Sequence, residues 1–321
     1  MCNVSPHLSL IGRLLTHTSA FSHSDRAMPS VANFTLFLDR IKDRGTFSEG
    51  DTISGKVSLR LLKDTKVLSL SVKAKSDVNT KFKQTDSTFR RHLRVFKIKA
   101  DLISADANTL LPSGSHLLNF TLPIPFEPLP SSFQSEYGSV TYSVEAKLSR
   151  RGKRARKVQH EINFCSRKTI SSLSPGENRS LKVNNGRSKI QLRVDRSVFS
   201  PGDDISVVAD LSNFSGRNLE PIFLLMRSDM FSSRRHQKTV VNCLQTEFKQ
   251  VLRSSHTRRD QCVLKVPQDA GLTVAHCEAL SVNFFVLVSL DALPCHLEAQ
   301  SMVEIMDRDA LSGAGRTPDV H

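Results

Sequence analysis

The chain of 321 residues is longer than one hydrophobic core usually supports, so its length favours two domains of about 130 to 150 residues each. Its hydrophobic share of 39% and charged share of 24% are ordinary for a globular protein and exclude wholesale disorder. The 45 Lys and Arg residues exceed the 31 Asp and Glu residues, which predicts attraction to phosphorylated peptides, acidic lipid or nucleic acid. A generally basic solvated surface would give the same count.

No targeting or membrane-spanning segment is evident. The apolar stretch at residues 8–15 is short and contains Gly12 and Arg13, so it does not resemble a secretory signal. The longest apolar run, residues 280–290, is about half of the roughly 20 residues that a membrane-spanning helix requires. This run therefore predicts a buried strand, and the cytoplasm is the expected compartment.

Several segments alternate apolar and polar residues with a period of two. Residues 31–38 form a first extended run. Residues 68–75 place Leu, Leu, Val and Ala opposite Ser and Lys, and residues 139–148 alternate in the same way. This period is typical of half-buried strands in antiparallel sheets. Residues 246–253 fit a helix and a strand equally well, and both alternatives stay open.

One motif occurs twice, at positions 47 and 199, which are 152 residues apart. Phe47-Ser-Glu-Gly-Asp-Thr-Ile-Ser54 returns as Phe199-Ser-Pro-Gly-Asp-Asp-Ile-Ser206, and an alternating segment follows each copy. Glycine tolerates the positive φ of a tight turn, and Asp can bond neighbouring backbone amides. The motif therefore predicts a turn that leads into a strand near the start of each of two similar halves.

The segment between the halves is rich in Ser, Asn, Gly and Arg and poor in apolar residues, which is typical of an interdomain connection. We therefore expect two all-β domains with flanking segments of little order. The expected boundaries are an N-terminal extension at 1–30, a first domain at 31–166, a linker at 167–186, a second domain at 187–306 and a short disordered tail at 307–321.

These motifs resemble those of the arrestin domain-containing proteins, or alpha-arrestins, and more loosely those of the receptor-binding arrestins. The similar segments are FSEGDTISGKV from Phe47, KVLSLSVKAK from Lys66, YGSVTYSVEAKL from Tyr137 and VDRSVFSPGDDI from Val194. The resemblance implies an all-β, arrestin-like fold of two consecutive antiparallel immunoglobulin-like β-sandwiches that meet at a hinge.

The same resemblance implies a function. It implies a non-catalytic adaptor, without cofactor or metal, that binds cytoplasmic parts of membrane receptors or transporters. Such an adaptor modulates endocytosis, endosomal sorting and ubiquitin-dependent turnover, and it is cytoplasmic and peripheral at the plasma membrane and endosomes.

One departure from the family concerns the ubiquitin-ligase machinery. Family members often carry Pro-Pro-x-Tyr motifs that bind the WW domains of Nedd4-type ligases. This chain contains no Pro-Pro pair, and its only tyrosines are Tyr137 and Tyr142. The departure puts direct ligase recruitment in doubt and indicates a diverged or tail-less member.

A first basic stretch, residues 63–99, contains eleven Lys or Arg residues and three acidic residues. Arginine binds phosphate and carboxylate oxygens in bidentate fashion and lysine acts as a point charge, so the mixture suits phosphorylated or acidic cytoplasmic tails. A solvated strand face with a mobile loop explains the stretch equally well. The candidate residues for cargo or anionic-lipid binding are Lys73, Lys75, Arg90, Arg91, Arg94, Lys97 and Lys99.

A second basic stretch, residues 150–157, places six cations in eight positions. Such a run can attract anionic lipid by about 1 kcal/mol per basic residue, although an exposed hairpin with incidental charge, nuclear import and RNA binding fit as well. The aromatic share of 6% gives little support for base stacking, so nucleic-acid binding is kept only as an alternative. The candidate residues here are Arg150, Arg151, Lys153 and Arg154.

The six cysteines are widely spaced and include no Cys-x-x-Cys pair, so reduced, buried thiols are expected. The pairs His276-Cys277 and Cys295-His296 are adjacent in sequence, and adjacent strand residues point to opposite faces. Neither a metal site nor a thiol nucleophile is therefore expected. A structural coat subunit of the retromer type would share the arrestin-like fold and is a further alternative.

Overall fold

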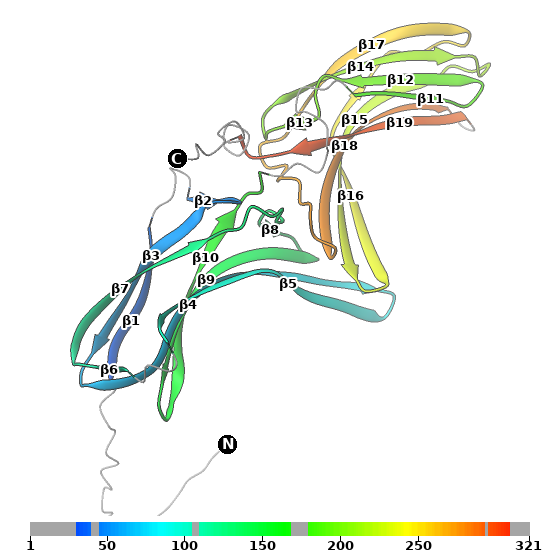
Figure 1. Cartoon of the computed structure of the whole chain (residues 1–321). Coiled ribbons are helices and arrows are strands. Elements are labelled where there is room, and N and C mark those ends of the chain that lie inside the picture. The colour runs from blue at the N-terminus through cyan, green and yellow to red at the C-terminus, as the bar shows by residue number, and fades with distance from the viewer. Residues whose placement is uncertain (1–29, 40–44, 105–108, 168–178, 293–294, 309–321) are drawn as a thin grey trace, which may run out of the picture.

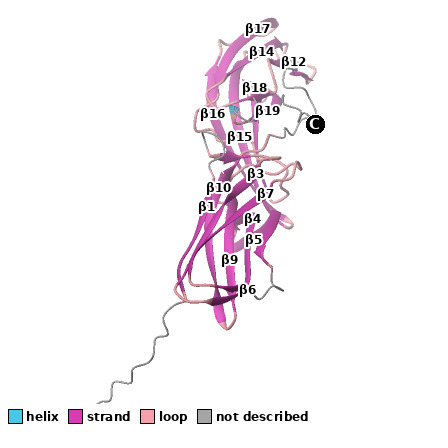
Figure 2. Cartoon of the chain, turned by 60° about the vertical axis from the view of Figure 1, so that its left-hand side comes forward, coloured by secondary structure: helices cyan, strands magenta, loops and turns pink. Residues whose placement is uncertain are grey.

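The computed structural model describes residues 30–39, 45–104, 109–167, 179–292 and 295–308, which fold into two β-sandwiches. The sandwiches follow one another along the long axis of the molecule (Figure 1), and Figure 2 shows the same order from another side. The predicted all-β fold with two consecutive sandwiches is confirmed. The terminal segments expected at 1–30 and 307–321 lie almost entirely outside the described residues.

The first sandwich packs a sheet in the order β1-β3-β7 on a larger sheet whose main path is β2-β10-β9-β4-β5. In the larger sheet, β6 pairs with β4 and β8 pairs with β9. The strands are β1 (Val31–Leu38), β2 (Thr46–Phe47), β3 (Thr52–Leu61), β4 (Thr65–Gln84), β5 (Ser87–Ile103), β6 (Thr109–Leu111), β7 (Gly114–Pro123), β8 (Phe133–Gln134), β9 (Gly138–Arg150) and β10 (Lys153–Phe164).

The second sandwich packs a sheet in the order β11-β12-β14-β17 on a sheet in the order β13-β19-β18-β15-β16. Strand β11 lies inside the segment expected to be the linker, 167–186, and pairs antiparallel with β12 at the edge of the sheet. The mostly polar composition of this segment had suggested a linker instead of an edge strand. The strands are β11 (Arg179–Asn184), β12 (Ser188–Val194), β13 (Val198–Phe199), β14 (Asp204–Asn213), β15 (Glu220–Ser233), β16 (His236–Phe248), β17 (His256–Lys265), β18 (Leu280–Ala292) and β19 (Cys295–Ile305).

Alternating burial explains the strands that the sequence predicts. In β4 and β9 the apolar positions point into the sandwich, and Val72 and Val144 are fully buried. The apolar run at 280–290 is the buried strand β18, as predicted. The ambiguous segment at 246–253 is strand as far as Phe248 and a loop beyond it. No described helix is long and apolar enough to cross a membrane.

The repeated motif builds the same turn in both sandwiches. Phe47 pairs in parallel with the end of β10, and Phe199 pairs in parallel with the end of β19. After each phenylalanine the chain turns through a glycine in the left-handed region, with φ of +79° at Gly50 and +87° at Gly202. The two short parallel pairings are exceptions to the antiparallel pattern that holds elsewhere.

The aspartate of each motif closes its turn and ties it to the last strand of its sandwich. The carboxylates of Asp51 and Asp203 accept hydrogen bonds from the serine amides three residues earlier, at 2.8 and 3.0 Å. Each also pairs with an arginine just beyond the final strand, Arg167 at 3.2 Å and Arg308 at 2.7 Å. The repetition therefore extends from sequence to side-chain contacts.

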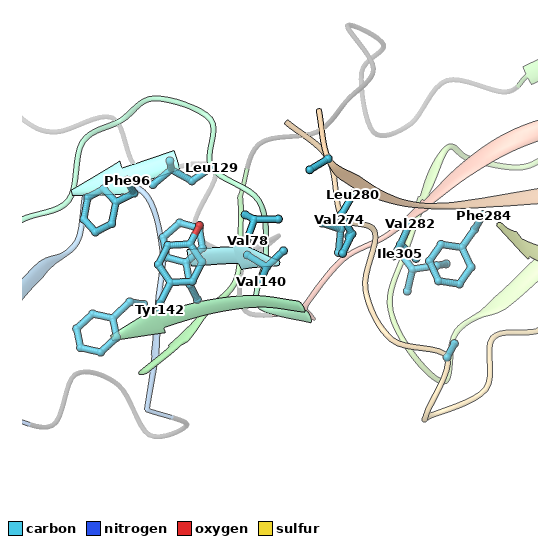
Figure 3. Close-up of a cluster of buried hydrophobic side chains, with 14 of the residues drawn as sticks. Val78, Phe96, Leu129, Val140, Tyr142, Val274, Leu280, Val282, Phe284 and Ile305 are labelled. Carbon is cyan, nitrogen blue, oxygen red and sulfur yellow. The ribbon is translucent and has the colours of Figure 1, made fainter. Parts of the chain in front are cut away.

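The hydrophobic cores of the two sandwiches are continuous. Figure 3 shows Val78 and Val140 of the first sandwich facing Val274 and Leu280 of the second. All four side chains are at most 1% exposed. The boundary between the sandwiches is therefore a packed apolar interface that holds one part of the molecule against the other.

Candidate functional site

Two long hairpins, one from each sandwich, meet where the sandwiches join (Figure 1). The β4–β5 hairpin turns at residues 85–86, and the β15–β16 hairpin turns at residues 234–235. We call the meeting point the hairpin junction and define it by residues 79–92 and 231–238. The junction therefore contains residues from both sandwiches.

Hydrogen bonds lock the two hairpins together. The hydroxyl of Thr80 donates to the backbone carbonyl of Ser232 at 2.9 Å, and both residues are buried. The hydroxyl of Ser233 donates in the opposite direction, to the backbone carbonyl of Arg90 at 2.9 Å. Two bonds of this kind fix the register of one hairpin on the other.

A ring stack and an ion pair extend the contact. The rings of Phe89 and His236 stack with centroids 3.9 Å apart and an interplanar angle of 22°. The guanidinium of Arg91 lies 2.7 Å from the carboxylate of Glu278, which precedes β18 in the second sandwich. Glu278 is largely exposed, so this ion pair contributes little to stability and mainly orients Arg91.

Aromatic side chains form the floor of the junction. Phe231 is 1% exposed, and its ring centroid lies 5.7 Å from that of Tyr137 and 6.4 Å from that of Phe133. A side chain at Gly138 would meet Phe231, so only glycine lets the two sheets approach this closely. The ammonium of Lys238 lies 4.5 Å above the Tyr137 ring, a favourable cation–π contact.

Positive charge gathers above this floor. Lys81 lies directly opposite Arg90 on the β4–β5 hairpin, and like charges in that position destabilise a sheet. Among the described residues, no ion pair neutralises either of them. The exposed cations of the junction are Lys81, Lys83, Arg90, Arg234 and Arg235. Two open hollows of about 420 and 430 Å³ flank the hairpin, and Lys81 lines both.

Away from the junction, carboxylates neutralise the same face of the sheet. Asp77 accepts hydrogen bonds from Lys75 at 2.8 Å, from Arg94 at 2.8 Å and from His92 at 3.1 Å. Partial burial acts to raise the pKa of Asp77, but the hydrogen bonds from Lys75 and Arg94 outweigh it and lower the pKa to about 2. Asp77 is therefore a permanent anion at neutral pH.

Glu145 acts in the same way further along the face. Burial would raise the pKa of Glu145, but Lys73 at 2.9 Å and Lys157 at 3.7 Å hold it below its ordinary value. Lys99 pairs with Asp101 at 2.6 Å. Carboxylates therefore neutralise Lys73, Lys75, Arg94 and Lys99 in the middle of the sheet.

Both turns of the junction contain a residue other than glycine in the left-handed region. Thr85 has φ of +54°, and Arg234 has φ of +54°. A β-branched residue such as Thr is strongly disfavoured there, at a cost of roughly 1 to 3 kcal/mol. Ser255 and His276, which lie outside the junction, also have positive φ.

The structure separates the candidate residues that the sequence predicts. Arg90 and Arg91 lie in the junction, while Arg94 and the four lysines at 73, 75, 97 and 99 lie on the middle of the sheet. The other group, Arg150, Arg151, Lys153 and Arg154, surrounds the β9–β10 turn at the far end of the first sandwich (Figure 1). The length of β9, about 40 Å, separates this turn from Arg90 and Arg91, whereas Lys73 lies opposite Glu145, only five residues before Arg150.

Sequence reasoning missed the half of the junction that comes from the second sandwich. Arg234, Arg235 and Lys238 form a short basic run, RRHQK, whose cations were visible in the sequence. Its place beside Lys81 and Lys83 was not visible, because about 150 residues separate the two segments.

The cysteines and histidines form no reactive arrangement among the described residues. Burial raises the pKa of the Cys262 thiol to about 11, so this group is not a thiolate at neutral pH. His256 lies six residues away on the same strand, about 20 Å along its axis. The expectation of buried thiols is wrong for Cys243, which is exposed.

Among the described residues, no group of three His, Cys, Asp or Glu side chains could hold a metal ion. The pair His276-Cys277 lies in the loop before β18. The side chains of Cys295 and His296 lie outside the described part of the chain.

Comparison with known proteins agrees with the repeated architecture. Residues 34–167 match the arrestin (or S-antigen) N-terminal domain, and residues 184–308 match the corresponding C-terminal domain. The chain is 23% identical over 221 residues to arrestin domain-containing protein 4 of Mus musculus, a match that covers 62% of this chain and 53% of that protein. It is 22% identical over 264 residues to thioredoxin-interacting protein of Rattus norvegicus, with 75% and 66% covered.

The chain thus spans about half to two thirds of the length of these relatives. The two domain matches follow the boundaries of the two sandwiches and together cover most of the chain. The chain therefore belongs to the arrestin family, in the alpha-arrestin branch that these relatives represent.

Proposed function

We propose that the protein is an adaptor that binds acidic or phosphorylated cytoplasmic segments of membrane receptors or transporters at the hairpin junction. By holding such cargo it modulates endocytosis, sorting and ubiquitin-dependent turnover, from a cytoplasmic position at the plasma membrane and endosomes. The observation that carries this proposal is the convergence of two basic hairpin turns, one from each sandwich, on one packed interface.

The charge distribution supports an extended, anionic ligand. The lysine and arginine side chains at 81, 83, 90, 234 and 235 are exposed on neighbouring turns, and the hollows beside them are open to solvent rather than enclosed. An open basic surface suits a peptide that lies across it, whereas a small molecule requires a concave pocket. Arginine forks favour phosphate and carboxylate groups in such a peptide.

The contacts between the hairpins support binding without large rearrangement. The backbone bonds from Thr80 and Ser233 and the buried ring of Phe231 fix the turns relative to one another before any ligand arrives. A preorganised surface avoids part of the entropic cost of binding. The same rigidity lets a ligand touch both sandwiches at once.

A binding measurement with defined peptides tests the proposal. An acidic phosphoserine peptide and its unphosphorylated form, each fluorescently labelled, are titrated with the full chain and anisotropy is recorded. Each charge-assisted contact is worth about 1.5 to 3 kcal/mol, so Lys81→Glu/Arg90→Glu should weaken phosphopeptide binding by at least about 100-fold. Arg234→Glu/Arg235→Glu should weaken phosphopeptide binding by a similar factor, because these two arginines form the second sandwich's side of the junction and Lys81 and Arg90 form the other.

The matched control is Arg151→Glu/Lys153→Glu, which reverses two charges at the other end of the first sandwich and should leave the affinity within a few-fold. An equal loss in the control would show that net charge alone drives binding, and unchanged affinity in both junction variants would refute the site. Single-stranded RNA is titrated in parallel. Tighter, steeply salt-dependent RNA binding would favour the nucleic-acid alternative.

A further inference from the structure

The far end of the first sandwich brings together three turns. We call it the distal end and define it by residues 62–66, 109–113 and 150–154. Lys66 of β4 lies directly opposite Leu110 of β6. The carboxylate of Asp64 accepts a hydrogen bond from the backbone amide of Ser113 at 2.8 Å. These contacts fix the first two turns side by side.

The β9–β10 turn lies beside them because β9 is the neighbour of β4. Val67 of β4 pairs with Arg150 of β9, and Arg150 pairs with Lys153 across the turn. The guanidinium of Arg150 is half-buried and donates to the hydroxyl of Ser30 at 2.8 Å. Burial, together with the nearby Arg156, lowers the pKa of Arg150.

Positive charge dominates the distal end. Asp64 is the one described carboxylate in these three segments, and it is held by the Ser113 amide. No ion pair with another described residue neutralises the exposed cations. These cations are Lys63, Lys66, Arg151, Lys153 and Arg154.

Two exposed leucines lie among these cations. Leu62 is 50% exposed and Leu110 is 57% exposed. Leu62 precedes Lys63 in the chain, and Leu110 lies opposite Lys66 of β4. The long lysine stems can remain beside apolar groups while their ammonium groups stay in water. A basic surface with a few protruding aliphatic side chains is typical of peripheral membrane contact.

We propose that the distal end docks on the surface of an anionic lipid bilayer, with Leu62 and Leu110 entering the headgroup region and the surrounding cations facing acidic headgroups. This site goes beyond the proposed cargo site, since it uses other residues at the other end of the sandwich. The apolar groups are leucines, and stacking on nucleic-acid bases requires aromatic rings, so the surface favours lipid over RNA.

Docking in this orientation would place the hairpin junction away from the membrane. Strand β9 runs from the interface between the sandwiches to the distal end, about 40 Å along its length. A cytoplasmic segment that starts in the same membrane would need about 12 extended residues to reach the junction. This consequence rests on the proposed function, whereas the lipid contact itself does not.

Vesicle sedimentation of the full chain tests the lipid contact. Vesicles of phosphatidylcholine alone are compared with vesicles in which about one third of the lipid is phosphatidylserine, and binding is expected only to the second kind. Each lost cation should weaken binding by about fivefold, so Arg151→Glu/Lys153→Glu/Arg154→Glu should lose at least about 100-fold. Leu62→Ser/Leu110→Ser should lose about 10-fold and retain its dependence on salt.

The matched control is Lys83→Glu/Arg234→Glu/Arg235→Glu, which reverses the same number of charges at the junction and should leave vesicle binding within a few-fold. All substituted residues are exposed, so the variants should fold. Equal losses in the control and the distal-end variant would overturn the proposal, as would unchanged binding of the distal-end variant. The proposal would also be overturned if the distal-end variant lost RNA binding but kept vesicle binding. The distal-end variant should still bind the phosphopeptide, so failure here is separable from failure of the cargo site.

Discussion

The substitution Phe231→Ala tests whether the two sandwiches behave as one body. Phe231 belongs to the second sandwich, but its ring packs on Tyr137 and Phe133 of the first. A buried phenylalanine removes roughly 200 Å² from water, which corresponds to about 5 kcal/mol, and measured Phe→Ala substitutions cost about 3 to 5 kcal/mol. We therefore expect the free energy of unfolding to fall by about 4 kcal/mol.

The chain supplies a probe for one sandwich only. It has no tryptophan, and both tyrosines belong to the first sandwich, Tyr142 inside β9 and Tyr137 just before it at the interface with Phe231. Tyrosine fluorescence therefore reports the first sandwich and its interface. Far-UV circular dichroism reports both. In urea, Phe231→Ala should lower the midpoints seen by both probes, although the substitution is in the second sandwich.

The control is Phe223→Ala, which removes an equally buried ring from the same strand, about 26 Å from Phe231 along β15. If the two sandwiches unfold as one body, Phe223→Ala should also lower both midpoints, because cooperative unfolding gives coincident transitions by the two probes. If Phe231→Ala leaves the tyrosine transition unchanged while the circular dichroism transition falls, the interface does not couple the sandwiches. The reasoning about a rigid junction would then be wrong.

Three further outcomes are expected. The depressed pKa of Asp77 contributes stability that is present above about pH 4 and is lost as the pH falls toward 2. After allowance for solvent screening, this contribution is about 1 to 2 kcal/mol. In urea titrations at pH 7 and near pH 2, Asp77→Asn should therefore be less stable than the unsubstituted protein at pH 7 and should lose less stability on acidification. Replacing the strained Thr85 by glycine should raise the unfolding free energy by about 1 kcal/mol, whereas Thr88→Gly, in the adjacent strand, should lower it, and the reverse order would contradict the strain. In the folded protein at neutral pH, a thiol reagent should modify exposed Cys243 well before buried Cys262, whose thiol titrates near pH 11, and equal rates measured by mass spectrometry would argue against this burial.

The sequence predicts the local architecture well because the decisive signals are local. A period of two in β4 and β9 reports which side chains face the core, and that depends only on the geometry of a strand. The repeated turn at Gly50 and Gly202 requires positive φ, a property of the residue itself. Strand β11 was missed because only Leu181 and Val183 mark its period of two, which is a short signal within an otherwise polar segment.

The functional surfaces depend on contacts between distant segments, which no local pattern records. The sequence identifies Arg90 and Arg151 as members of basic stretches, but only the paired sheets place one at the junction and the other about 40 Å away at the distal end. The packing of Phe231 against Tyr137 and the hydrogen bonds from Thr80 and Ser233 bring the second basic turn beside the first. The residues of each segment fix its charge. The way in which the two sandwiches fold and meet decides which segments become neighbours, and therefore which charges remain uncompensated.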